Sequence, residues 1–308
     1  MGHIRVPELV RQQALANGAA GARWLEALPA VVRSLAARWD LEVGEAFAGG
    51  TASYVAAAAD SEGREVVLKV AMVLGTDDAA LFERSVAVHG LAGGRGCVVL
   101  LDHDEDRFAM LLERLGPDLD ALGMPVPQLL EAVAATLREF WRPRTPGVEL
   151  PSGADQAGRL ARHIERTWEA LGRPCERAVV DRALDLCERR AAELDPTSCV
   201  LVHGDAHGWN TLAAEEGHYR LVDPEGLWSE PEHDLGVLLR EYNLPLLAGD
   251  TAPLVRARAE QLAVACEADP ERIEEWGFIE RVSTGLASLQ AFDGDGGLAF
   301  LEVARRCL

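Results

Sequence analysis

Several kinds of segment are missing from this sequence of 308 residues. No apolar run approaches the roughly 20 residues that a membrane-spanning helix needs. The N-terminus also lacks the apolar core and cleavage site of a secretory signal. The six cysteines stand singly, without a C-x-x-C pair, so neither a zinc site nor a disulfide framework is expected. These absences predict a cytoplasmic protein with free thiols.

Basic residues are scarce beside acidic ones. The chain has 30 Lys and Arg against 50 Asp and Glu, a formal net charge of −20. This acidity argues against nucleic acid or an anionic membrane as partner. It would suit a cationic small-molecule substrate, although a solubilising acidic surface is the simpler explanation. The sequence does not distinguish a monomer from a dimer.

Two nucleotide-binding fingerprints are absent as well. No glycine fingerprint follows a strand and opens a helix, which excludes a Rossmann site, and no G-x-x-x-x-G-K-[ST] loop is present. The length instead favours two lobes that share one functional cleft.

The pattern of apolar and polar residues changes twice along the chain. Residues 7–40 predict two helices. Short β-type runs at 41–52, 54–59, 65–70, 98–102 and 108–112 follow, with a helix at 77–91. Helical patterns then dominate at 129–141, 156–171, 176–194, 233–246, 252–268 and 271–289, interrupted by β-like runs at 200–204, 211–214 and 219–222. This α+β pattern predicts an N-terminal lobe (1–112) with a small antiparallel sheet, a hinge (113–117) and a larger helical C-terminal lobe (118–308).

The region of these β-like runs contains the residues that indicate a catalytic site. Asp205 is followed five residues later by Asn210, and the next hairpin ends in Asp223. Phosphoryl transfer needs a carboxylate near the acceptor hydroxyl and oxygen ligands that hold Mg²⁺ against the phosphates. Each residue alone could be an ordinary turn former. The ordered set favours a phosphotransfer loop.

The motifs around this loop resemble the catalytic region of the aminoglycoside phosphotransferases, members of the protein-kinase-like superfamily. Within that group the chain looks most like the streptomycin 6-phosphotransferase and hydroxyurea phosphotransferase branch. The resemblance covers nearly the whole chain. It rests on His203-Gly-Asp-x-His-x-x-Asn210, Asp223-Pro-Glu-Gly226 and Pro231-Glu-His-Asp-Leu235, with support from Ile4-Arg-Val-Pro7, Trp24-Leu-x-x-Leu-Pro29, Leu100-Leu-Asp-His-Asp104, Leu111-Leu-Glu-Arg-Leu115 and Trp276-Gly-Phe-Ile-Glu-Arg-Val-Ser-Thr-Gly-Leu286.

The resemblance implies a bilobal kinase-like fold, ATP and Mg²⁺ as cofactors, and a role for each loop residue. Asp205 would be the catalytic carboxylate, and Asn210 and Asp223 would bind Mg²⁺. His203 would brace the loop rather than react. His207 is expected to be structural too, because an i, i+4 pair forms a metal site on a helix and not in a loop. Asp234 would hydrogen-bond back to the loop.

Lys69 is the one lysine of the chain and lies within an apolar strand pattern. A buried lysine needs a partner. In kinases of this superfamily such a lysine meets the α- and β-phosphates and a helix glutamate, for which Glu83 is the expected residue. The alternative is an edge lysine that faces solvent.

Other nucleotide contacts are expected from weaker signals. The turn Gly49-Gly-Thr-Ala-Ser53 would cover the phosphates, with Ser53 as a contact. Glu113 and Leu115, after the last strand, would offer backbone groups to adenine.

Substrate contacts are expected beside Asp205 from acidic and aromatic side chains. The candidates are Glu225, Trp228, Glu230 and Glu232, with Trp209 and Asp293 as further positions. Trp209 could equally pack under the loop, and the carboxylates could be solvated surface. Two features depart from the relatives: no histidine follows Phe140-Trp-Arg142, and the stretch 291–297 does not match a streptomycin-binding pattern.

Three functions are therefore compared. The first is an ATP-dependent phosphotransferase that inactivates an aminoglycoside such as streptomycin, or hydroxyurea, by phosphorylating a hydroxyl. The second is a kinase of a sugar or another endogenous metabolite. The third is a non-catalytic, pseudokinase-like binding protein, against which the intact set of Lys69, Asp205, Asn210 and Asp223 argues.

Overall fold

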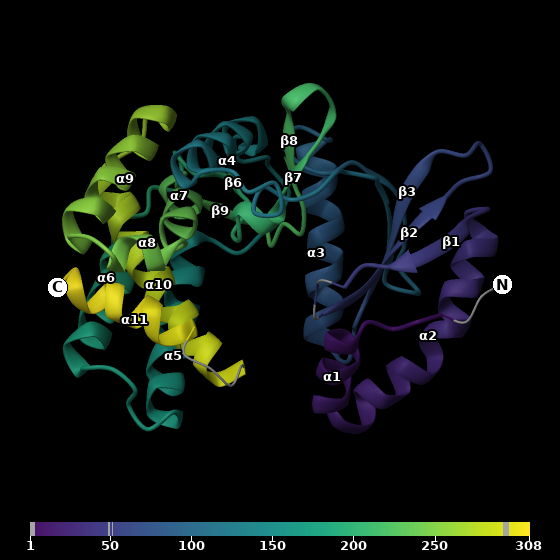
Figure 1. Cartoon of the computed structure of the whole chain (residues 1–308), viewed down its shortest axis with the longest axis horizontal. Coiled ribbons are helices and arrows are strands. Elements are labelled where there is room, and N and C mark those ends of the chain that lie inside the picture. Colours follow the sequence, from purple (N-terminus) through teal and green to yellow (C-terminus); the bar gives the residue numbers. More distant parts are fainter. Residues whose placement is uncertain (1–3, 49, 51, 292–295) are drawn as a thin grey trace. The chain divides into compact units, whose positions relative to one another are not determined.

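The computed structural model of the chain describes residues 4–48, 50, 52–291 and 296–308. It divides into two compact units, Met1–Gly116 and Pro117–Leu308 (Figure 1). The division falls within residues 113–117, the segment that the sequence predicts to be the hinge.

The first unit is built around an antiparallel sheet of five strands in the order β1-β2-β3-β5-β4. Strand β3, which carries Lys69, is the central strand. The elements are α1 (Glu8–Ala16), α2 (Gly18–Arg38), β1 (Glu42–Ala46), β2 (Ser53–Ala59), β3 (Glu65–Ala71), α3 (Thr76–Ala92), β4 (Leu100–Asp104) and β5 (Ala109–Glu113).

Helix α2 packs on one face of this sheet. Its apolar residues recur at helical spacing, so Leu28, Val32 and Leu35 form one buried stripe. The stripe contacts Leu68 and Val70, which point to the same face of β3 because side chains alternate along a strand. Figure 1 shows α2 running beside the sheet.

The second unit is mainly helical. One core lies where α10 packs against α5, α6 and α11, with side chains such as Leu160, Ile164, Leu186, Ile279 and Leu286 fully or almost fully buried. The helices are α4 (Val126–Phe140), α5 (Gly153–Ala170), α6 (Arg177–Glu193), α7 (Glu232–Leu239), α8 (Asn243–Leu247), α9 (Thr251–Cys266), α10 (Pro270–Ala291) and α11 (Gly296–Arg306). Over the described ranges, no helix has both the length and the apolar character to cross a bilayer.

Two short antiparallel strand pairs interrupt these helices. They are β6 (Val200–Val202) with β9 (Leu227–Ser229), and β7 (Thr211–Ala213) with β8 (Tyr219–Leu221). Short 3-10 turns, η1 (Gly208–Asn210) and η2 (Glu215–Gly217), precede and follow β7. The predicted α+β fold is confirmed.

The structure differs from the sequence prediction in three elements. Strand β9 and helix α11 are not part of the predicted pattern. The predicted helix 233–246 is wrong as a single element, since it breaks between α7 and α8 at Tyr242, whose φ of 56° is left-handed. Arg281 stabilises the break by donating to the carbonyl of Leu239 at 2.6 Å and to Oδ1 of Asn243 at 3.1 Å.

Candidate active site

The loop after β6 carries most of the residues that the sequence singles out. It contains His203, Gly204 and Asp205 and leads through η1 into β7. Gly204 has a φ of 89°, and a Cβ at this position would lie 3.1 Å from the Cβ of Glu225. Glycine therefore lets the chain turn here without strain or crowding.

Asp234 ties this loop to helix α7. The side chain is fully buried in the first turn of the helix. Its Oδ2 accepts the backbone N–H of His203 and its Oδ1 that of Gly204, each at 2.8 Å, and the indole Nε1 of Trp141 donates to Oδ2 at 2.9 Å. One buried carboxylate thus satisfies three donors and sets the start of the loop.

His203 is held from both sides of its ring. Nδ1 accepts the backbone N–H of Asp205 at 3.2 Å, so Nε2 carries the proton and donates to the carbonyl of Val222 at 3.0 Å. Phe140 contacts the ring edge to face, with centroids 5.5 Å apart. Burial lowers the pKa of this fully buried histidine, which favours the neutral ring that these hydrogen bonds require.

The carboxylate of Asp205 has a partner on each oxygen while its side chain stays 35% exposed. Oδ1 accepts from Nη2 of Arg240 at 2.6 Å. Oδ2 lies 3.3 Å from Nδ2 of Asn210 and 3.4 Å from Nε2 of His207. Burial alone would raise the pKa of Asp205, but the hydrogen bond from His207 and the charge of Arg240 outweigh it and hold this pKa well below its ordinary value. Asp205 is therefore ionised at neutral pH.

The hairpin of β7 and β8 brings Asn210 and Asp223 to the same end. Thr211 pairs with Leu221, and the backbone N–H of Val222 donates to the carbonyl of Asn210 at 2.9 Å. Asp223 follows directly, with an exposed side chain and a left-handed φ of 60°. The two residues that the sequence predicts as metal ligands are thus neighbours.

The donor chemistry of this pair fits Mg²⁺. Nδ2 of Asn210 donates to the backbone carbonyl of Asp205 at 2.9 Å, which leaves Oδ1 as the amide atom that can bind a cation. Asp223 adds carboxylate oxygens, and Mg²⁺ is commonly bound by one or two protein oxygens with phosphates and waters completing the shell. Within the described residues no group of three His, Cys, Asp or Glu could hold a metal by itself.

A second anchor joins the loop to the start of the second unit. The backbone N–H of Leu119 lies 3.3 Å from the carbonyl of Gly208 and 3.1 Å from that of Thr211. Tyr242 donates its hydroxyl to Oδ2 of Asp120 at 2.9 Å, and a Cβ at Gly208 would collide with both groups. The sequence prediction missed this contact because nothing in the spacing of these residues indicates it.

Glu225 is the predicted substrate residue that the structure leaves accessible. Its side chain is 46% exposed, and one oxygen lies 3.7 Å from Nη2 of Arg159. Partial burial and then the negative charge of Asp205 raise the pKa of Glu225. A carboxylate with so little positive charge beside it favours a cationic ligand.

Glu230 and Glu232 make their contacts inside the helical unit and not with Asp205. Glu230 is buried and accepts from Nη1 of Arg272 at 3.0 Å and from the indole of Trp276 at 2.7 Å. Glu232 is nearly buried and accepts the backbone N–H of Asp269 at 3.0 Å. Both carboxylates stabilise the packing of helices, so we leave them out of the proposed substrate site.

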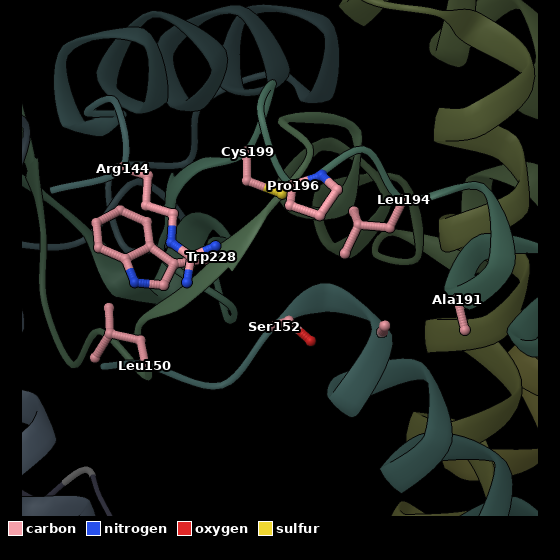
Figure 2. A pocket seen from close by; sticks show the side chains of 9 residues that line it. Arg144, Leu150, Ser152, Ala191, Leu194, Pro196, Cys199 and Trp228 are labelled. Atoms are coloured by element: carbon pink, nitrogen blue, oxygen red, sulfur yellow. The ribbon is translucent and has the colours of Figure 1, made fainter. Parts of the chain in front are cut away.

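Trp228 is fully buried, and its indole donates to the carbonyl of Val148 at 3.0 Å. It lines a hollow of about 240 Å³ in which Asp205, Asn210 and Asp223 take no part (Figure 2). We therefore leave Trp228 out of the substrate site as well. The other lining residues are Arg144, Leu150, Ser152, Ala154, Ala191, Leu194, Pro196 and Cys199.

Trp209 differs from Trp228, because 55% of its surface is exposed although it lies in η1, in the same loop as Asp205. Its ring lies edge to face with His207, with centroids 5.5 Å apart. An exposed indole held this way can stack on a ligand. Asp293 lies outside the described residues.

In the first unit, Lys69 lies on the central strand of the sheet and not at an edge. Its Cα pairs with Val55 on β2 and Met110 on β5, and the side chain is half-buried. Alternation places it on the face opposite Leu68, which faces α2. Glu83 is exposed on α3. The Lys69–Glu83 pair stays a prediction.

The remaining predicted nucleotide residues also belong to the first unit. Ser53 begins β2, whereas Gly49 and Thr51 of the same turn lie outside the described residues. Oε1 of Glu113 accepts the backbone N–H of Val99 at 2.7 Å, so this side chain fastens β5 to the segment before β4. Leu115 is largely buried.

Arg240 is the functional-site residue that sequence reasoning missed. It is largely buried at the end of α7, and its partners besides Asp205 are Glu241 at 2.9 Å and Glu280 at 3.2 Å. An arginine directly after the apolar run 235–239 was the available signal, because a buried guanidinium needs carboxylates. The sequence did not reveal which carboxylates those would be.

Comparison with known proteins identifies the family of the chain. Residues 38–293 match the model of a family described as aminoglycoside/hydroxyurea antibiotic resistance kinase. A streptomycin 6-kinase of Streptomyces glaucescens is 30% identical over 303 residues, 96% of this chain and 94% of that protein. A hydroxyurea phosphotransferase of Kitasatospora aureofaciens is 31% identical over 308 residues, 98% of this chain and 84% of that protein.

Solved structures support the fold. A choline kinase of Streptococcus pneumoniae superposes with a TM-score of 0.60, covering 91% of this chain and 98% of its own, at 16% identity. At that identity the likeness concerns the fold alone. The resemblance predicted from the loop motifs is confirmed by the family match and by relatives that extend over nearly the whole chain.

Proposed function

The chain belongs to the family of aminoglycoside/hydroxyurea antibiotic resistance kinases, and we propose that it transfers the γ-phosphoryl group of ATP to a hydroxyl of a small antibiotic-like molecule. The proposal rests on one observation: Asp205, Asn210 and Asp223 lie at one end of a hairpin, and Asp205 is ionised and partly exposed. Phosphoryl transfer depends mostly on positioning and electrostatics, and this arrangement provides both. The expectation of a cytoplasmic enzyme belongs to the same proposal.

Asp205 would orient the acceptor. Its carboxylate accepts a hydrogen bond from the acceptor hydroxyl and directs the oxygen lone pair toward the γ-phosphorus. The new O–P bond forms while the bond between the γ-phosphorus and the β–γ bridging oxygen breaks, and ADP leaves. The hydroxyl proton passes to Asp205 only after the new bond has made it acidic, and from there to solvent.

Asn210 and Asp223 would hold Mg²⁺. Bound there, the ion would neutralise charge on the nucleotide phosphates. Asp234 and His203 support this part of the site indirectly, since they fix the loop backbone on either side of Gly204.

Residues of the first unit would bind the nucleotide. We propose Lys69 as the contact to the α- and β-phosphates and Glu83 as its partner. Ser53 is proposed to contact the phosphates, and the backbone of Glu113 and Leu115 to contact adenine. The central position of β3 supports Lys69, because such a strand holds its side chains rigidly.

The acceptor is proposed to be a cationic molecule related to streptomycin. Two of the relatives act, by their names, on streptomycin and on hydroxyurea. Glu225 favours the cationic one, since its carboxylate is exposed and lies close to the negative charge of Asp205. Trp209 adds an aromatic face on which a cation or a ring can stack.

An acceptor screen tests the proposal. Purified protein with ATP and Mg²⁺ is assayed for ADP release with streptomycin, other aminoglycosides, hydroxyurea and simple sugars. We expect streptomycin-dependent ADP release. Release with a sugar alone would replace the proposed acceptor with an endogenous metabolite. Nucleotide binding without turnover on any acceptor would indicate a binding protein instead.

A further inference from the structure

The guanidinium of Arg240 bonds to three carboxylates at once. Nη2 donates to Oδ1 of Asp205 at 2.6 Å, Nε to Glu241 at 2.9 Å and Nη1 to Glu280 at 3.2 Å. Glu280 also lies 3.3 Å from Nε2 of the buried His233. The planar guanidinium of arginine can donate hydrogen bonds in three directions at fixed angles, which the ammonium group of lysine cannot do.

The two oxygens of Asp205 differ in how tightly they are held. The 2.6 Å bond to Arg240 is short and charge-assisted, whereas Asn210 and His207 lie 3.3 and 3.4 Å from Oδ2. Bonds weaken as they lengthen beyond about 3 Å, so the partners of Oδ2 are the easier ones to exchange. Oδ2 is therefore the oxygen that can receive a new donor.

We propose that Arg240 is a positioning residue: it clamps Oδ1 of Asp205 so that Oδ2 meets the acceptor hydroxyl in a fixed orientation. This inference rests on the proposed phosphotransferase function. The break between α7 and α8 makes the clamp possible, because it ends the helix at Arg240, next to Glu241. Arg281 keeps that break in place.

The test compares Arg240→Gln and Arg240→Lys with a matched control. Arg190→Lys changes an equally buried arginine of the same unit whose carboxylate partners, Glu230 and Glu275, do not touch Asp205. For each variant, kcat and KM for ATP and for the acceptor are measured between pH 5 and 9, and folding is checked by urea titration.

Arg240→Gln should lower kcat on the order of 10²-fold, as expected for a misplaced catalytic group, with little change in KM for ATP. Arg240→Lys should lower kcat about tenfold, again with little change in KM for ATP. Arg190→Lys should change neither kcat nor KM for ATP.

Failure of the two proposals can be told apart. A wild-type protein that turns over no acceptor refutes the phosphotransferase function itself. An active wild type whose Arg240 variants match Arg190→Lys in kcat refutes the clamp alone. If Arg240→Gln does not fold, Arg240→Lys decides by the same comparison of kcat at unchanged KM for ATP.

Discussion

Oδ2 of Asp234 accepts the backbone N–H of His203 at 2.8 Å, across 31 residues of sequence. The same carboxylate serves Gly204 and Trp141. A single buried side chain on α7 therefore sets where the catalytic loop begins, and the position of Asp205 depends on a helix that follows it in the chain.

Asp234→Ala tests this anchor. Three buried donors would lose their carboxylate acceptor, so we expect the free energy of unfolding to fall by about 3 kcal/mol or more. Urea unfolding followed by circular dichroism measures the change. The control is Asp181→Ala, which removes an exposed pair with Arg177 and should cost less than about 1 kcal/mol. Equal stability of the two variants would show that the anchor contributes nothing.

Asp205→Asn tests the catalytic carboxylate. The amide keeps the shape but cannot accept the hydroxyl proton or pair fully with Arg240. Turnover should fall by about 10³-fold or more, with ATP binding largely retained. ADP release and isothermal titration with a non-hydrolysable ATP analogue measure the two quantities. Retained turnover would contradict the assigned role.

Asp223→Ala tests the metal ligands. We expect nucleotide affinity to lose its dependence on Mg²⁺, because one of the two proposed protein oxygens is gone. Nucleotide titrations at a series of Mg²⁺ concentrations measure this. Asp102→Ala is a control in the other unit, where the carboxylate bonds to the indole of Trp39. A Mg²⁺ titration identical to that of the wild type would refute the assignment.

Glu225→Gln tests recognition of a cation. Removing the charge should raise KM for a cationic acceptor about tenfold and leave KM for ATP unchanged. In the wild type the pKa of Glu225 is raised, so its charge is lost at a higher pH than for an ordinary glutamate as the solution is acidified. KM for the cationic acceptor should therefore rise as the pH falls through this pKa, and the variant should lack that rise. A variant with the wild-type pH profile would exclude Glu225 from the site.

Alkylation of Cys187, a buried free thiol, tests its environment. Burial raises its pKa to about 12, so almost no thiolate forms at pH 8. Iodoacetamide should leave Cys187 unmodified in the native protein and alkylate it in urea, as mass spectrometry of tryptic peptides would show. Rapid native alkylation would contradict the buried environment.

Much of the fold could be predicted because it depends on local patterns. Apolar spacing in α2 and alternation in β3 follow from helical and strand geometry, and each pattern spans a few neighbouring residues. Strand β9 has three residues, too few for a periodic pattern. Helix α11 has eleven residues and buries Gly297, Leu301 and Ala304 at helical spacing, so its pattern was present in the sequence and was missed. The break at Tyr242 depends on Arg281, which is 39 positions away in the sequence and invisible to a local pattern.

The residues proposed for catalysis and metal binding could be predicted from the sequence, because Asp205, Asn210 and Asp223 lie in one short hairpin region whose spacing is typical of a phosphotransfer loop. The substrate candidates were harder. Glu225, Glu230 and Trp228 look alike as neighbours in sequence, yet one is exposed and two are buried with partners. Burial is a property of the packed lobe, and composition does not reveal it.

By itself, the sequence determined the reaction type and the family, since a catalytic loop needs particular residues at particular spacings within about 20 positions. Only the tertiary structure decided what surrounds Asp205. The guanidinium of Arg240 reaches one oxygen of that carboxylate from the end of another helix, and Asp234 fixes the loop from the same helix. Contacts of this kind depend on packing between distant segments, and charge and hydrogen bonding then assign each partner its role.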